Sequence, residues 1–247
     1  MNRTSLLLIC SLFSVVPLLA IADKPAKRIS FSALEFTGVV QQNGHGSFDY
    51  FAQDLSKESG VEFDYHVMSP ARGAKAFFAG QKDCLIPSSA HPPYFEGLDV
   101  IHSEQFAQVL YLAFTLPDQA KITNKRQLKG KVIGVLRDES TWNYEKRFDI
   151  NGATYVKVGS LESLVEMLYR KRVDVAIHDH QDFISVTEFF KHAPPNYSIT
   201  NPMAVDNVVI TCHNNRQNQT FIETINPIIV KFVERGLSYY YEKATID

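Results

Sequence analysis

The pattern of apolar and polar positions divides the chain into two similar segments. Each segment is expected to contain strands and helices in alternation. The first has strands over 29–34, 61–67 and 82–87 and helices over 48–59 and 71–79. The second has strands over 130–136, 153–158 and 173–177 and helices over 142–148 and 161–168. Strand, helix, strand, helix, strand predicts a mainly parallel sheet flanked by helices, and it does so twice. The fold class is therefore α/β with two lobes.

Further apolar runs predict the connections and the end of the chain. The pattern indicates strands over 108–114 and 207–212, a helix over 183–190 and a final helix over 221–235 that Gly236 stops. Ser47 is expected to cap the first helix. The two isolated strands place crossings between the lobes near 110–114 and 204–210, and two crossings make a hinge that bends about one axis. The alternative is one rigid α/β domain with these strands in its middle.

Candidate ligand positions follow from this arrangement, because ligands of open parallel sheets collect beyond the carboxyl ends of the strands. In the second segment those ends carry 137–141 and 178–180, which are polar. In the first segment they carry Glu35 and Phe36, and a loop that begins with Ser88 and Ser89. Facing strand-end loops from two lobes would form the walls of a cleft.

Composition restricts the class of protein. A hydrophobic content of 45% supports a large core, and a formal net charge of -2 gives no electrostatic reason to expect nucleic acid or an anionic membrane as partner. Arg3, the apolar run 6–19 and the small residues Ala20 and Ala22 predict a signal peptide over 1–22. The run is shorter than the about 20 residues that cross a bilayer. We expect an exported, periplasmic protein.

Two cysteines remain after the signal peptide. Cys84 and Cys212 each lie in a predicted strand. A single possible bridge is not a disulfide framework. We therefore expect two small, buried, unpaired residues, with a bridge in an oxidising compartment as the alternative.

Two stretches carry a family resemblance. QLKGKVIGVLRDEST (127–141) and VKVGSLESLVEMLYRKRVDVAIHDH (156–180) resemble the second lobe of periplasmic solute-binding proteins of ABC importers, in the amino-acid-binding branch. Pro70, Arg72, Gly80 and Asp83 resemble the matching unit of the first lobe. The resemblance implies the type 2 periplasmic-binding fold, with lobe one at 23–110 and 208–247 and lobe two at 111–207.

The resemblance also implies ligand-binding residues. It places a carboxylate for the ligand's ammonium group at Asp179, a hydroxyl pair at Ser140 and Thr141, and hydroxyls at Ser88 and Ser89. The structural alternative is that Asp179, Ser140 and Thr141 cap helices and do not contact a ligand. Asp138 and Glu139 stand where the family usually has a glycine.

The largest departure from the family concerns the ligand carboxylate. The arginine that should follow Ser89 is absent, so either Arg72 or Arg137 substitutes or the ligand is not an ordinary α-amino acid. The alternative role of Arg72 is a structural ion pair within its lobe instead of a ligand contact. Phe36, Tyr94 and Trp142 lie on the predicted loops and are candidates for contact with an apolar part of the ligand, although aromatic residues more often serve the core.

A metal site is the chemical alternative at the second lobe. His178 and His180 form a His-x-His pair, which His45, His91, His102 or His213 would have to complete. No third ligand at diagnostic spacing and no H-E-x-x-H motif is present, so we expect neither metal nor cofactor.

The resemblance implies a binding protein rather than an enzyme. It would capture a small polar metabolite, as a monomer, and deliver it to an ABC permease. One alternative is a sensor that docks on a membrane receptor. The other is a periplasmic enzyme on the same scaffold, with Asp179 or Glu35 as general acid or base and His91 as partner.

Overall fold

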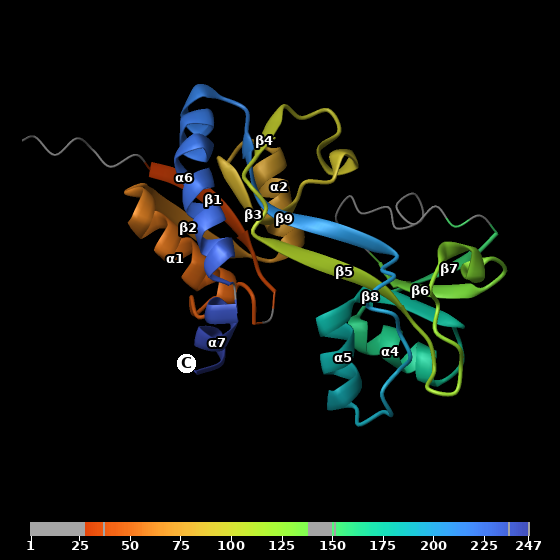
Figure 1. The fold of residues 1–247 in the computed structure, drawn as a ribbon. Helices are drawn as coiled ribbons and strands as arrows, with labels where there is room; N and C mark the ends of the chain where they lie inside the picture. The colour runs from red at the N-terminus through yellow and green to blue at the C-terminus, as the bar shows by residue number, and fades with distance from the viewer. Residues whose placement is uncertain (1–27, 37, 138–149, 151, 237, 247) are drawn as a thin grey trace, which may run out of the picture.

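The computed structural model describes residues 28–36, 38–137, 150, 152–236 and 238–246. The predicted signal peptide therefore lies outside the described residues, as does the helix predicted over 142–148. Two groups of elements lie side by side in Figure 1, and two long strands run between them.

The first group alternates strands and helices as the sequence predicts. It consists of β1 (Arg28–Leu34), α1 (Ser47–Ser59), β2 (Glu62–Met68), α2 (Pro70–Phe78) and β3 (Cys84–Ser89). Strands β2 and β3 both pair in parallel with β1. The expected end of β3 was wrong, because the strand continues through Ser88 and Ser89, which pair with Val209 and Val208 of a later strand.

The start of α1 also corrects a prediction. Ser47 is the first helical residue, and the N-cap is Gly46. A Cβ atom at Gly46 would lie 2.3 Å from the carbonyl oxygen of Val39, so only glycine fits there. Asp49 completes the turn by accepting the Gly46 backbone N–H at 2.9 Å. At the other end Gly60 adopts a left-handed conformation that stops the helix, as expected.

The second group repeats the alternation. It consists of β6 (Val132–Leu136), β7 (Thr154–Val158), α4 (Leu161–Tyr169), β8 (Val175–Asp179) and α5 (His180–Phe189). Strands β7 and β8 pair in parallel with β6. The short 3-10 helix η2 (Lys125–Leu128) precedes this group, and Asn124 caps it by accepting the Arg126 N–H.

Two strands connect the groups into one continuous sheet of order β2-β1-β3-β9-β5-β8-β6-β7. They are β5 (Ala107–Phe114) and β9 (Ala204–His213), which pair with one another over 107–111 and 204–208. Beyond that pairing β5 continues beside β8, whereas β9 continues beside β3. A 3-10 helix, η1 (Pro92–Phe95), and a short strand, β4 (Val100–His102), which the sequence pattern did not predict, lie between β3 and β5.

The chain ends in two helices rather than one. Helix α6 (Arg216–Arg235) begins five residues before the predicted start, with Asn215 as its N-cap. A second helix, α7 (Ser238–Ile246), follows Gly236 and packs against α1. Gly236 ends α6 as predicted, but the expectation that this helix is the last one was wrong. No helix among the described residues is long and apolar enough to cross a membrane.

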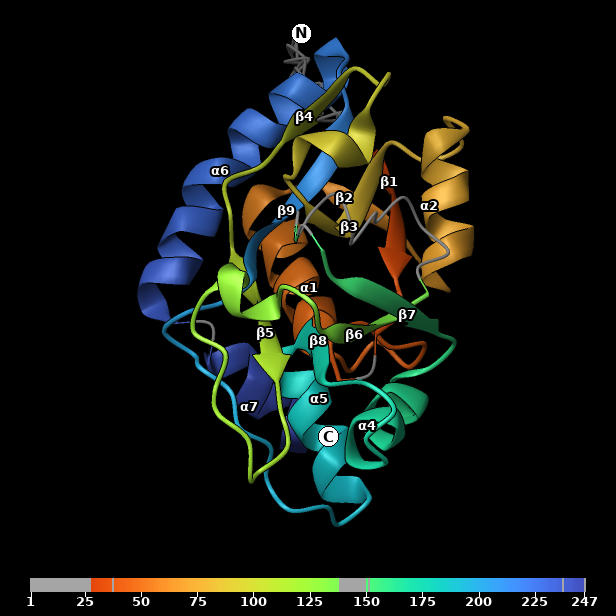
Figure 2. The ribbon, with the colours of Figure 1, turned by 90° about the vertical axis from the view of Figure 1, so that its right-hand side faces the viewer.

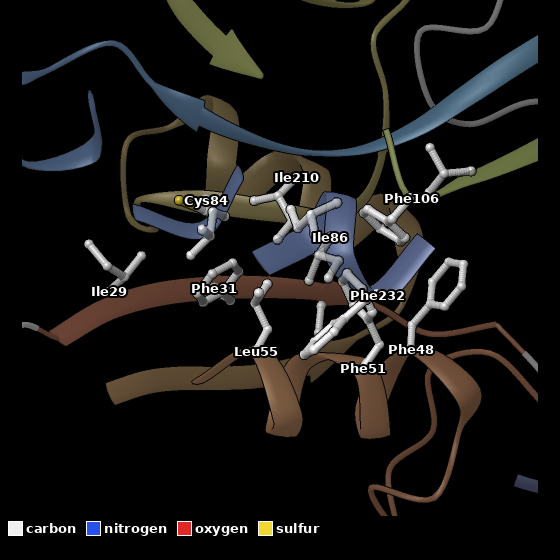
Figure 3. Close-up of a cluster of buried hydrophobic side chains, with 14 of the residues drawn as sticks. Ile29, Phe31, Phe48, Phe51, Leu55, Cys84, Ile86, Phe106, Ile210 and Phe232 are labelled. Carbon is white, nitrogen blue, oxygen red and sulfur yellow. The ribbon is translucent and has the colours of Figure 1, made fainter. Parts of the chain in front are cut away.

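Each group has its own hydrophobic core. In Figure 3, side chains from β1, β3, β9, α1 and α6 point toward one another in the first core, with Phe31 fully buried among them. The sheet of the second group has a core on each face. One contains Tyr111 and Ile177, and the other contains Phe114 and Phe183, whose rings stack at 4.0 Å between centroids. Separate cores explain why the molecule has two lobes.

Cys84 and Cys212 form a disulfide, so the expectation of unpaired cysteines was wrong. Both are fully buried, as expected. They are direct partners in the antiparallel pair of β3 and β9, with Cα atoms 4.0 Å apart. Their sequence separation of 128 gave no sign of this bond, because only the sheet topology brings the two strands together.

Candidate functional site

The sheet register brings the carboxyl ends of the two parallel groups toward one another. Strand β3 ends at Ser89, level with Val208 and Ala107. Strand β8 runs in the opposite sense and ends at Asp179, level with Tyr111. The two levels are four residue steps apart along β5, from Ala107 to Tyr111, which corresponds to about 14 Å of extended chain. The carboxyl ends of β3 and β8 are therefore directed toward one another along the crossover strands.

Asp179 lies at the end of β8 and is partly buried. It is also the N-cap of α5, and its Oδ1 accepts the backbone N–H of Asp182 at 3.0 Å. The capping interpretation of Asp179 is therefore confirmed. The other carboxylate oxygen makes no hydrogen bond to any residue that the structure describes, so capping uses only one of the two oxygens.

Asp182 gives this strand end a second carboxyl group. Desolvation first, and the neighbouring charge of Asp179 second, raise the pKa of Asp182 to about 6. Within the described ranges no lysine or arginine nitrogen lies within 4 Å of either carboxylate. His178 Nε2 lies 3.9 Å from Asp182 Oδ2, but burial lowers the pKa of His178 to about 4, so this ring is neutral near pH 7. No cation among the described residues therefore compensates the negative charge of Asp179 and Asp182.

Helix α7 places a tyrosine within electrostatic range of the same point. The pKa of Tyr241 is raised, mainly by burial and then by the charge of Asp179. In Figure 1, α7 lies on lobe one at the height of α5 on lobe two, and in Figure 2 the two helices again lie at one height. The sequence pattern predicted no helix after Gly236 and therefore did not indicate Tyr241 as a site residue.

Acidification should lower the free energy of unfolding through His178. The pKa of His178 falls from 6.5 to about 4 on folding, so between these values the unfolded chain binds a proton that the folded chain does not. Stability is then lost as the pH falls below 6.5, by at most about 3 kcal/mol at pH 4. The raised pKa of Asp182 acts in the opposite direction over much of the same range.

Denaturant unfolding of the wild type and of His178→Gln at about pH 7 and about pH 4.5 measures this effect. The variant should lose less stability on acidification than the wild type. Equal losses in the two proteins would contradict the assignment to His178.

Lobe one contributes hydroxyl groups at the opposite strand end. Ser88 is partly exposed, and its Oγ accepts a hydrogen bond from Thr211 Oγ1 at 2.7 Å. Ser89 is buried, and its Oγ accepts the backbone N–H of His91 at 3.2 Å. Side chains of adjacent residues in a strand point to opposite faces of the sheet. The hydroxyl groups of Ser88 and Ser89 therefore do not contact the same ligand group.

The other candidates from lobe one are distributed around its strand ends. Arg72 is exposed in the first turn of α2 and makes no ion pair with any described residue, so its predicted ion pair within the lobe is not observed. Helix α2 returns antiparallel to β2, which brings its first turn to the edge where β1 ends. Phe36 is 41% exposed just after β1, whereas Tyr94 packs partly buried against Phe95.

Three predicted site residues, Ser140, Thr141 and Trp142, lie outside the described residues. Arg137, the alternative partner for a ligand carboxylate, is exposed directly after β6. Its backbone N–H donates to Val158 O.

The histidines of the metal hypothesis have other neighbours. His213 stacks on Phe77 with ring centroids 4.3 Å apart, and His102 Nδ1 lies 2.9 Å from Thr211 Oγ1. The ring of His180 packs against Tyr197 at 4.9 Å. Across the residues that the structure describes, no three His, Cys, Asp or Glu side chains converge on a position for a metal ion.

Known proteins resemble this chain in fold and not in sequence. It matches no protein-family model and no curated protein sequence. Among solved structures, the GluR0 ligand-binding core in complex with L-glutamate has a TM-score of 0.69 at 15% identity, over 89% of this chain and 98% of that one. A histidine kinase sensor domain with similarity to periplasmic binding proteins has 0.66 at 13% identity, over 90% and 95%.

The substrate-binding protein of an amino acid ABC transporter is also similar, with a TM-score of 0.61 at 16% identity over 88% of this chain and 96% of that one. Identities of this size show a shared fold. The matches confirm the two-lobed α/β architecture that the sequence predicts.

Proposed function

We propose, since the chain has the two-lobed fold of type 2 periplasmic binding proteins, that it captures a small amino-acid-like metabolite between its lobes. The observation that carries this proposal is the pair Asp179 and Asp182. Their carboxylates lack a cationic partner among the described residues, and Asp179 is the last residue of β8, whose carboxyl end is directed toward lobe one. Such a pair is completed by a ligand that brings a positive charge.

The ligand's ammonium group is assigned to lobe two. Asp179 keeps one carboxylate oxygen for the N–H of Asp182 and offers the other to the ligand. Asp182 adds negative charge beside it, and the neutral ring of His178 does not compensate that charge. A charge-assisted hydrogen bond in this environment is about twice as strong as a neutral one.

The carboxylate or another anionic part of the ligand is assigned to lobe one. Arg72 replaces the arginine that the family places after Ser89. It is exposed and without an ion pair in the described part of the chain, and the first turn of α2 is not capped by the Ser69 side chain. Free N–H groups at a helix N-terminus favour an anion. Ser88 supplies a hydroxyl at the end of β3.

Closure of the lobes follows from the crossover. We assign 23–110 and 208–247 to lobe one and 111–207 to lobe two, and the bending segments to 107–111 and 204–208. Their backbones pair directly, and Gln108 Nε2 donates to Asn207 Oδ1 at 3.0 Å across them. Two paired strands bend together more easily than they twist, so the strand ends approach as the lobes close.

Delivery of the ligand to an ABC permease is the physiological role we propose, with export to the periplasm by the signal peptide at 1–22 and a monomeric state. A sensor domain and a transporter component are both similar in fold. Reconstituted transport of the ligand by an ABC permease that depends on this protein would support delivery. Docking on a membrane receptor without transport would favour sensing.

Isothermal titration calorimetry with L-arginine, L-glutamate, putrescine and succinate tests the binding proposal. We expect binding of at least one amino acid that is recovered unchanged. Turnover of a panel member would replace the proposal with an enzyme, and binding of succinate alone would contradict the role of the acidic pair.

Asp179→Asn should lower the affinity for the amino acid at least tenfold, about 1.4 kcal/mol, because it removes the charge that attracts the ammonium group. Asparagine still caps α5, so the fold is preserved. The matched control is Asp118→Asn, which removes an exposed carboxylate in a turn of lobe two. Equal affinities of wild type and Asp179→Asn would remove Asp179 from the site.

A further inference from the structure

Three side chains on lobe one form a continuous hydrogen-bond chain. His102 Nδ1 lies 2.9 Å from Thr211 Oγ1, and Thr211 Oγ1 donates to Ser88 Oγ at 2.7 Å. The three residues come from β4, β9 and β3, and the register of these strands places them on one face of the sheet. Thr211 in the middle is fully buried, whereas Ser88 at the end is partly exposed.

The series of hydrogen bonds from His102 through Thr211 to Ser88 has a direction, because a hydroxyl group has only one hydrogen to donate. Thr211 uses its hydrogen toward Ser88, so the bond between Thr211 and His102 requires a hydrogen on His102 Nδ1. Burial lowers the pKa of His102, so the neutral ring carries a hydrogen on only one of its nitrogens. Ser88 then accepts through its oxygen, and its own hydrogen has no acceptor among the residues that the structure describes.

The free hydrogen of Ser88 lies at the carboxyl end of β3, which faces lobe two across the crossover. This end of lobe one is also the edge at which α2 begins, with the exposed side chain of Arg72. A fixed hydroxyl donor and a cation at the same edge of the sheet are together complementary to a carboxylate.

We infer that His102 and Thr211 are positioning residues that make Ser88 a hydrogen-bond donor to the carboxylate of the bound ligand. The inference rests on the proposed function, because it names a contact to the ligand of that same site. If the neutral ring of His102 carries its hydrogen on Nε2, both hydrogen bonds of the series reverse. Ser88 then donates to Thr211 and is an acceptor for a ligand N–H group. The tautomer of His102 therefore decides between a carboxylate and an amine at this position.

The tautomer is measured without a ligand. Two-dimensional NMR of the protein with ¹⁵N-labelled histidine distinguishes the two neutral forms by their ring nitrogen shifts. We expect His102 to be protonated at Nδ1, and Thr211→Val to change the shifts of His102 as its acceptor is lost. Protonation at Nε2 would overturn the inference whatever the protein binds.

Binding is measured with pairs of probes that differ by one carboxylate: L-arginine with agmatine, and L-glutamate with 4-aminobutyrate. Ser88→Ala should lower the affinity for L-arginine and L-glutamate, which carry the α-carboxylate, about tenfold or more, and Thr211→Val about three- to tenfold. Neither change should alter the affinity for the decarboxylated probe. Equal losses for both members of a pair would show a general structural effect and overturn the inference.

Thr187→Val is the matched control. Thr187 is buried in α5, and its Oγ1 donates to the carbonyl of Phe183 at 2.7 Å, so the variant removes a similar hydrogen bond in lobe two. Its affinity for L-arginine and L-glutamate should equal that of the wild type. If wild-type protein binds none of the four probes, the proposed ligand class and the role of Ser88 both fail. The NMR measurement of the His102 tautomer is independent of this result and still shows whether the hydrogen bonds run from His102 to Ser88.

Discussion

Replacement of both Cys84 and Cys212 by alanine is expected to lower the free energy of unfolding by about 2–5 kcal/mol. The bridge closes a loop with a sequence separation of 128 residues. Loop-closure entropy for a loop of this length corresponds to about 5 kcal/mol. The loop contains all of lobe two, and any residual structure in lobe two after unfolding of lobe one would reduce the effect. Guanidinium unfolding monitored by circular dichroism measures the difference.

Reducing agent provides the control for this experiment. It should destabilise the wild type by a similar amount and leave the double alanine variant unchanged. A wild type whose unfolding midpoint is the same with and without reducing agent would show that the cysteines are not bonded in solution.

Phe31→Ala should lower the free energy of unfolding by about 3–5 kcal/mol. Phe31 is fully buried in the central strand of lobe one, where its ring lies 4.7 Å from Phe63 and 5.9 Å from Phe221 between centroids. Truncation removes these contacts and leaves a cavity in a core built from several elements, which cannot collapse around one missing ring. Thermal or denaturant unfolding with oxidised disulfide measures the loss.

Phe189→Ala is the matched control for Phe31→Ala. Phe189 is 78% exposed near the end of α5, so the same chemical change should alter the stability by less than about 0.5 kcal/mol. Similar losses in the two variants would mean that the buried position of Phe31 does not determine its contribution.

The fold was largely predictable because its main elements are buried on one or both faces. Apolar runs such as 132–136 and 175–177 left little ambiguity, and the alternation of strands with helices fixed the parallel pairing. Helix α7 was missed because its three tyrosines and polar residues carry no clear apolar face. Strand β4 was missed because three residues are too few to establish a period.

The candidate site was less predictable, because its chemistry depends on neighbours far apart in the sequence. Asp179 could be found from its place at the end of a buried strand and from the family resemblance. Asp182 carried no separate signal, since its raised pKa results from the surroundings that the fold creates. The chain from His102 through Thr211 to Ser88 spans more than a hundred residues and needs the register of three strands.

The continuity of β5 restricts how this hinge is able to evolve. Along β5, Tyr111 and Ala113 belong to one core of lobe two, while Leu112 and Phe114 belong to the core on the other face. Inserting one residue between 107 and 111 would exchange these sets and turn every later side chain of the strand to the wrong face. Hinges of different length among related proteins should therefore differ by even numbers of residues, or carry a compensating bulge, in both crossing strands together.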